Sequence, residues 1–198
     1  NDQPISPAYK YFNSELPQRS YDPDKAKFHL NKAGLTSADV ELTASPTIFP
    51  NAMDAVVLYK EQAAEAGINL TPNQVSADGY WSNTWMKSPW AASYWSGRPT
   101  EDWMLSQIYS GESSWNETRW SSPRFDELLT MARVELDESK RGEMYGEMQQ
   151  LIHEDGGAVI PLFANHLIGY SDKVGHPESV AGNWDLDGNR ILERWWIN

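Results

Sequence analysis

The 198-residue chain contains no cysteine, so it can form neither a disulfide framework nor a thiolate metal site. It is also poor in basic residues, because 16 Lys and Arg stand against 28 Asp and Glu for a formal charge of −12. A negative charge of this size opposes binding to phosphate backbones and anionic lipid, so we expect no nucleic-acid partner. Long hydrophobic runs are missing as well. The uncharged stretch at residues 156–171 is too short to span a bilayer as a helix, and it contains Pro161.

Signatures of catalysis and of metal binding are equally scarce. The Gly-x-Ser-x-Gly turn of many hydrolases does not occur, and the four histidines show no i, i+4 pair that would hold a metal on a helix. Asp185, Asp187 and Glu193 superficially suggest a calcium loop. Gly188 stands at the wrong position for that loop, so Asp187 and Gly188 are interpreted as a turn. We therefore predict no metal, no cofactor and no catalytic residue.

Prolines, glycines and capping residues divide the chain into short elements. The first 21 residues, which hold three prolines and no periodic pattern, are expected to form an extended, packed loop. Helices are predicted over residues 23–33, 52–66, 101–109, 123–136 and 140–155, with Asp22, Asn51, Thr100 and Ser122 as N-caps. Strands are predicted over residues 40–44, 68–75, 90–95, 158–170 and 191–197. This order indicates an α/β fold with helices packed on a mixed sheet.

What the chain has in abundance is tryptophan, with ten in all and seven of them within residues 81–120. Because these positions keep no single helical or strand face, not all of the rings can point into one core, and some are expected to line a cavity. Indole rings offer rigid faces to sugars, side chains or cations. Carboxylates stand nearby at Asp78, Glu101 and Asp102, so a glycosidase or a carbohydrate-binding module remains an alternative.

Arg98 lies inside this tryptophan-rich segment, just before the helix that Thr100 is expected to cap. A guanidinium group and a helix N-terminus would together favour an anionic ligand group. The structural alternative is that Arg98 forms an ion pair with Glu101 or Asp102, and the sequence leaves both readings open.

Several segments, in this order, resemble one family. They are YDPDKAKFHLNKAGL at residues 21–35, SYWSGRPTED at 93–102, NETRWSSPRFDELL at 116–129, DESKRGEMYGEMQQLIHED at 137–155 and AVIPLF at 158–163. Together they resemble the C-terminal part of the extracytoplasmic solute-binding proteins of the peptide/nickel family, which serve ABC importers.

The resemblance implies a periplasmic-binding-protein-like fold in which two lobes close over a small ligand. Residues 1–170 would form part of the second lobe, and residues 171–198 would cross back into the first. It further implies a periplasmic, monomeric protein that binds a solute without transforming it. Its partners would be a membrane permease and an N-terminal remainder of the same protein.

In this family the strand and turn before the second-lobe helix help to form the pocket. The resemblance therefore makes Trp90, Tyr94, Trp95 and Arg98 candidate ligand-binding residues, and the tryptophan cluster adds Trp81 to them. Peptide-binding members usually carry an acidic residue in this turn, whereas residues 93–99 hold none and offer Arg98. A peptide-like, opine-like or sugar-like solute is expected, with charge complementarity favouring one that bears a carboxylate or several hydroxyls.

Overall fold

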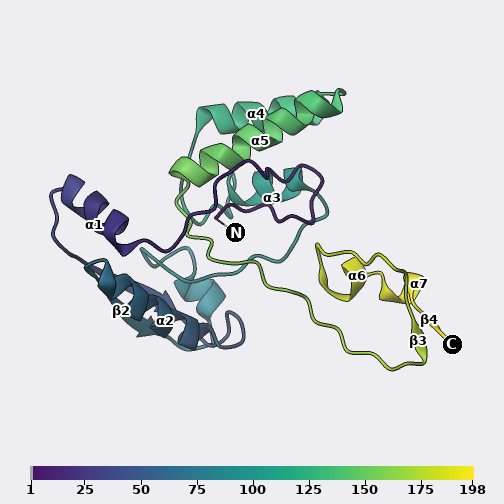
Figure 1. Ribbon diagram of the computed structural model, residues 1–198, viewed down its shortest axis with the longest axis horizontal. Helices are drawn as coiled ribbons and strands as arrows, with labels where there is room; N and C mark the ends of the chain where they lie inside the picture. Colours follow the sequence, from purple (N-terminus) through teal and green to yellow (C-terminus); the bar gives the residue numbers. More distant parts are fainter. Residues whose placement is uncertain (1) are drawn as a thin grey trace. The chain divides into compact units, whose positions relative to one another are not determined.

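The computed structural model describes residues 2–198, which fall into two compact units (Figure 1). One unit is Ser20–Trp95. The other unit consists of two stretches of chain, the residues before Ser20 and Ser96–Asn198. No helix within residues 2–198 is both long enough and apolar enough to cross a membrane. These two units do not test the predicted division into two lobes at residue 170, which stays a prediction.

The unit Ser20–Trp95 is built on a β-α-β arrangement. Strand β1 (Ala38–Ala44) pairs in parallel with β2 (Ile68–Gln74), and helix α2 (Ala52–Glu65) connects them and packs on both (Figure 1). Helix α1 (Pro23–Lys32) precedes them, and a single π-type turn, η1 (Tyr80–Thr84), follows. Alternating and helical apolar spacing sends one set of side chains into a common core. That core comprises Leu42, Ala44, Ile48, Ala52, Val56, Leu70 and Tyr80.

Two local predictions in this unit are wrong. Asn51 does not cap α2 through its side chain, because its backbone is left-handed with φ 63°. The strand predicted at residues 90–95 is reduced to one bridge, in which Thr43 bonds to the Trp90 carbonyl and the Ala92 amide. Beyond this bridge, the Ala92 carbonyl accepts a hydrogen bond from the Tyr80 hydroxyl at 2.6 Å.

The second unit is mainly helical. Helix α3 (Glu101–Ile108) is followed by the hairpin of α4 (Pro123–Val134) and α5 (Glu138–Asp155), which lie side by side (Figure 1). The predicted caps Thr100 and Ser122 accept hydrogen bonds from the third residue beyond them. The hairpin buries Phe125, Leu128, Leu129, Ala132, Tyr145, Met148 and Ile152. Leu136, expected on this apolar face, is instead 89% exposed because α4 ends at Val134.

Residues 2–19 form the extended, packed loop that the sequence predicts, and we call this segment the strap. Ile5 is fully buried, and the strap backbone bonds to side chains of α3 and α5 rather than to a strand. Tyr11 stacks on Tyr145 of α5 with ring centroids 5.2 Å apart. The strap is thus part of the folded body of this unit.

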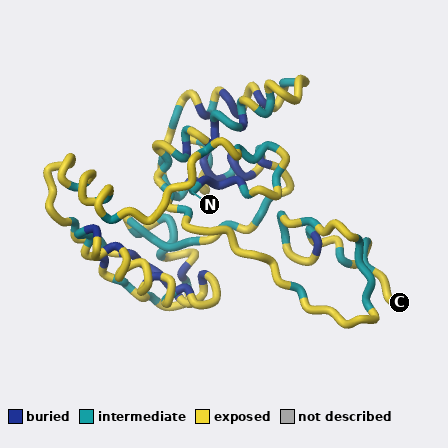
Figure 2. The backbone as a smooth tube through the Cα atoms, viewed as in Figure 1, coloured by how far each residue is buried: buried dark blue, intermediate teal, exposed yellow. Residues whose placement is uncertain are grey.

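The buried strand predicted over residues 158–170 is wrong for this chain. Within residues 2–198 the segment joins no sheet, and Figure 2 shows it exposed along most of its length. Leu162 is 66% exposed and Leu167 is 92% exposed. Apolar, β-branched composition makes a strand only where a neighbouring strand supplies hydrogen bonds.

The last 25 residues form a small antiparallel pair of β3 (Val174–Gly175) and β4 (Trp196–Ile197) with two short helical turns between them. These turns are α6 (Asp185–Asn189) and α7 (Ile191–Arg194). Asp187 and Gly188 have positive φ values, in keeping with the predicted turn. The strand expected over 191–197 is correct only for its last residues, since α7 occupies its first half.

Candidate functional site

Most of the predicted aromatic residues meet in one cluster on the unit Ser20–Trp95. Trp81 contacts Trp85 at 6.0 Å and Tyr94 at 5.6 Å between ring centroids, and Trp85 contacts Trp95 at 5.9 Å. All three pairs meet edge to face, the geometry that aromatic quadrupoles favour. The π-type turn η1 carries Trp81, and Gly79 before it has φ 74°, a left-handed conformation that suits glycine.

The aromatic cluster is anchored on one side and open on the other. Tyr80 is 1% exposed, and its ring centroid lies 5.1 Å from that of Trp81. Its hydroxyl donates to the Ala92 carbonyl and so holds the segment that leads to Tyr94. In contrast, Trp81 is 39% exposed and Tyr94 is 54% exposed. Rigid rings with accessible faces on a buried base are suited to hold a ligand by contact.

Trp90 does not join this cluster. It packs against the core of its unit and meets Tyr59 of α2 edge to face at 6.0 Å. Trp85 was counted among the clustered tryptophans, but neither it nor Tyr80 was chosen as a candidate ligand-binding residue, although both hold the cluster together. Only the turn geometry of η1 brings them into contact, and no sequence spacing signals that turn.

Arg98 belongs to the other unit, where its guanidinium folds back toward its own turn. Nε donates to the side-chain oxygen of Gln107 at 2.6 Å, and one terminal nitrogen donates to the Ser96 carbonyl at 2.9 Å. The structural alternative was an ion pair with Glu101 or Asp102, but the structure shows Asp102 paired with Arg133 and Glu101 bonded to the Tyr11 amide. Those two carboxylates have other partners.

The acidic residues near α3 serve the architecture of this unit. Asp102 forms a bidentate ion pair with Arg133 of α4, with a shortest distance of 2.7 Å. Glu101 is buried and accepts the Tyr11 amide of the strap at 2.7 Å. The carboxylate pair that a glycosidase requires is therefore not found in these two residues.

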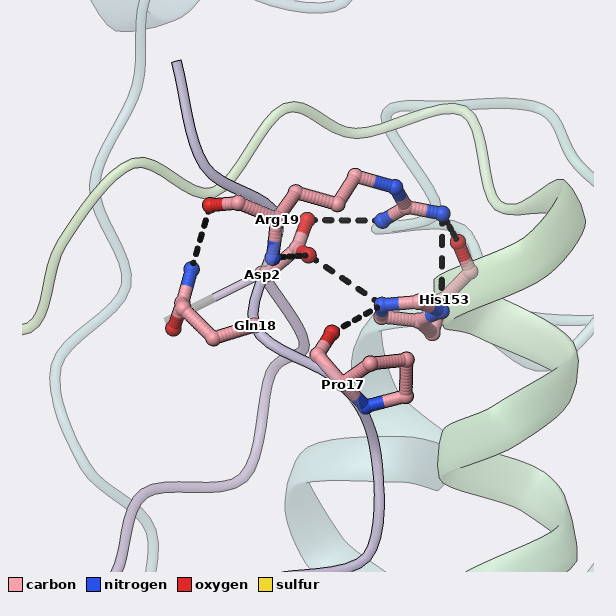
Figure 3. Close-up of polar contacts among 5 residues, drawn as sticks. All are labelled: Asp2, Pro17, Gln18, Arg19 and His153. Carbon is pink, nitrogen blue, oxygen red and sulfur yellow. Dashed lines mark hydrogen bonds and ion pairs between the residues drawn. The ribbon is translucent and has the colours of Figure 1, made fainter. Parts of the chain in front are cut away.

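Another cluster of ionisable groups fastens the strap to the end of α5 (Figure 3). Arg19 donates to Asp2 at 2.7 Å and to the His153 carbonyl at 2.6 Å, while the His153 ring lies 3.1 Å from Asp2. Burial works to raise the pKa of Asp2, but hydrogen bonds and the charge of Arg19 outweigh it and lower the pKa overall. Within residues 2–198 no group of three or more His, Cys, Asp or Glu side chains is arranged to hold a metal.

Two of the hollows on the surface of the described residues contain no predicted ligand residue. One lies beside β2 and α2 at Lys60 and Ile68–Pro72, and the other lies at the tip of the α4–α5 hairpin around Val134 and Leu136. The aromatic cluster is thus an exposed surface of its unit, and neither hollow encloses it.

Comparison with known families gives one extended match. Residues 1–117, more than half of the chain, match the model of the bacterial extracellular solute-binding proteins, family 5 middle region. Among curated proteins, the chain is 29% identical over 168 residues to di/tripeptide-binding protein 4 of Pseudomonas aeruginosa, covering 76% of this chain and 30% of that protein. It is 26% identical over 170 residues to the dipeptide-binding protein of Escherichia coli, covering 79% and 31%. The chain thus spans about three tenths of the length of these relatives.

Solved structures give the same picture. The periplasmic binding protein DppA of Helicobacter pylori, in complex with the peptide STSA, superimposes with a TM-score of 0.69 at 23% identity, over 78% of this chain and 31% of that one. MoaA of A. tumefaciens R10, in complex with mannopinic acid, superimposes with a TM-score of 0.64 at 26% identity, over 76% and 32%. These likenesses confirm the α/β fold of periplasmic binding proteins.

The resemblance read from the sequence segments is confirmed by the family model, which ends within the tryptophan-rich stretch. The chain belongs to the bacterial extracellular solute-binding proteins of family 5, a family that binds solutes rather than transforming them.

Proposed function

We propose that this chain is part of the substrate-binding component of an ABC importer, working outside the cytoplasm, where it captures a small organic solute for a membrane permease. The observation that carries the proposal is the family match over residues 1–117. The aromatic cluster supports it, since Trp81 and Tyr94 present accessible ring faces on a buried base. A ligand closes two lobes only through its greater affinity for the closed state, and such ring faces supply contacts of that kind.

We further propose that the chain works together with an N-terminal remainder of the same protein. The exposed apolar residues of the segment 158–170 support this, because Leu162 and Leu167 leave much apolar surface in water. A sheet in the remainder would give this segment a neighbouring strand, which residues 2–198 do not supply. Residues 171–198 would then belong to the first lobe, and the whole protein would be a periplasmic monomer.

The ligand-binding residues that we propose are Trp81, Trp90, Tyr94, Trp95 and Arg98. The turn at residues 93–99 carries a guanidinium and no carboxylate, so it suits a solute with an acidic group better than the free amino end of a peptide. A relative that is 26% identical was solved with mannopinic acid, which is by name an acid. Other relatives are named for dipeptides and tripeptides, so peptides belong in any test.

The test is isothermal titration calorimetry on the complete protein that carries this sequence, with mannopinate and the dipeptide Met-Leu as probes. Trp95→Ala and Arg98→Ala are each expected to weaken binding of the preferred probe by about 1–3 kcal/mol, or about 5-fold to 150-fold, without loss of fold. Trp115→Ala is the matched control, since Trp115 is a 46%-exposed tryptophan outside the proposed site. Wild-type affinity in both site variants would remove the site assignment.

A further inference from the structure

The backbone of Arg98 is hydrogen-bonded to a tyrosine side chain of the strap. The Tyr9 hydroxyl donates to the Arg98 carbonyl at 2.6 Å and accepts from the Arg98 amide at 2.7 Å. Both backbone groups of one residue are therefore bonded to a single side-chain oxygen that lies 89 positions away in the sequence.

One neutral hydroxyl can make both bonds at once, because it has one proton to donate and lone pairs to accept. Burial raises the pKa of Tyr9, so the hydroxyl keeps its proton throughout the physiological range. The Arg98 amide and carbonyl both point toward this oxygen, as they would toward a neighbouring strand. Tyr9 thus supplies the hydrogen bonds that would otherwise come from a sheet.

The position of Tyr9 is itself fixed from the same stretch of chain. Two residues further on, the Tyr11 amide donates to the buried Glu101 carboxylate at 2.7 Å. Tyr11 also stacks on Tyr145 of α5, with ring centroids 5.2 Å apart. The strap therefore presents Tyr9 from a rigid support.

The other side of the turn is closed by the C-terminal segment. The Asn183 side-chain amide donates to the Arg98 carbonyl at 3.3 Å. Gly97 lies so close that a Cβ on it would overlap the Asn183 carbonyl oxygen, and the Tyr9 hydroxyl would lie 3.2 Å from that Cβ. The turn before α3 is thus held between two segments remote in sequence, with the Tyr9 hydroxyl making the shorter bonds.

We infer that Tyr9 is a positioning residue for ligand binding, whose hydroxyl orders the turn at residues 96–99 so that Arg98 meets an acidic group of the solute. The inference rests on the proposed function, because it gives Tyr9 a role only if Arg98 contacts ligand. A group held in place before binding loses less entropy when the ligand arrives, so loss of the hydroxyl lowers affinity through Arg98.

The test compares Tyr9→Phe, Arg98→Ala and the double variant in the complete protein. Tyr21→Phe is the matched control, because the Tyr21 hydroxyl also donates to a backbone carbonyl, that of Gln62 at 2.9 Å, in the other unit. Calorimetry with mannopinate and Met-Leu measures affinity. Hydrogen-exchange mass spectrometry of a peptide covering residues 94–101 measures the order of the turn without ligand, and thermal unfolding checks the fold.

Tyr9→Phe is expected to weaken binding of the preferred probe about threefold to tenfold, the worth of about one net hydrogen bond, and to speed exchange in the 94–101 peptide. In the Arg98→Ala background the same change is expected to have no further effect on affinity, since Tyr9 acts through Arg98. Tyr21→Phe is expected to leave both readouts unchanged.

The failures are distinguishable. If Arg98→Ala weakens binding while Tyr9→Phe does not, or if Tyr9→Phe weakens binding equally in both backgrounds, the positioning role of Tyr9 is overturned and the proposed function stands. If neither probe binds or Arg98→Ala has no effect, the ligand assignment of Arg98 falls, and the role of Tyr9 falls with it. Unchanged exchange in Tyr9→Phe overturns the ordering of the turn in every case.

Discussion

Replacing Gln149 of α5 should loosen the whole attachment of the strap. Gln149 is fully buried, and its side-chain oxygen accepts the Asn13 amide at 2.9 Å. Its side-chain nitrogen donates to the carbonyls of Tyr11 at 2.7 Å and Tyr145 at 2.8 Å. One side chain therefore satisfies two backbone groups of a segment that has no sheet partner there.

The expected cost follows from those bonds. Gln149→Leu keeps a similar side-chain volume, so little of its effect comes from a cavity. It leaves the Asn13 amide and the Tyr11 carbonyl without their partner, and an unsatisfied buried polar group costs about 1–3 kcal/mol. Two such groups would together cost about 2–6 kcal/mol. Because part of the strap can turn toward water, we expect the free energy of unfolding to fall by an amount in the lower part of that range, about 2–4 kcal/mol.

Urea unfolding followed by circular dichroism measures this change. The control is Gln150→Leu, because Gln150 is the next residue on the same helix, is exposed, and its side chain donates to Glu154 of its own helix at 2.8 Å. The control should cost less than about 0.5 kcal/mol. Equal stability of the two variants would refute the reasoning that Gln149 holds the strap.

Two further predictions concern stability. Gly97→Ala should destabilise the protein by about 2 kcal/mol or more in thermal unfolding, because its Cβ would overlap the Asn183 carbonyl, whereas Gly169→Ala, with open space around it, should be near neutral. The Ala181 amide, with the Trp195 indole, lowers the pKa of Asp187. The Asp187 carboxylate therefore stabilises the fold above the unfolded-state pKa of about 3.9, and this is lost as pH falls through the lower folded-state pKa. Asp187→Asn should thus destabilise at pH 7, and urea unfolding should show the gap to wild type narrowing as the pH falls below about 3.9.

Local chemistry made the helices predictable. Asp22, Thr100 and Ser122 cap their helices as expected, because a capping side chain needs only an amide two or three residues away. Asn51 failed because its left-handed backbone turns the side chain away from that role. Prediction from the sequence thus succeeded where both partners lie within one turn of chain.

Strands and the candidate site depend on distant partners. The segments 90–95 and 158–170 have strand-like composition, but neither finds a full neighbouring strand within residues 2–198. Irregular spacing of the tryptophans indicated that they would not share one core, yet which rings meet depends on the turn at Tyr80–Thr84. The hydrogen bonds between Tyr9 and Arg98 join residues 89 positions apart, and no local sequence pattern predicts them.

Native mass spectrometry of the complete protein as purified tests the solute-binding role most directly. We expect a monomer that retains one small organic acid per polypeptide, and that loses it when Trp95 and Arg98 are both replaced by alanine. A protein that carries no solute and takes up neither mannopinate nor Met-Leu when these are added would contradict the proposed function.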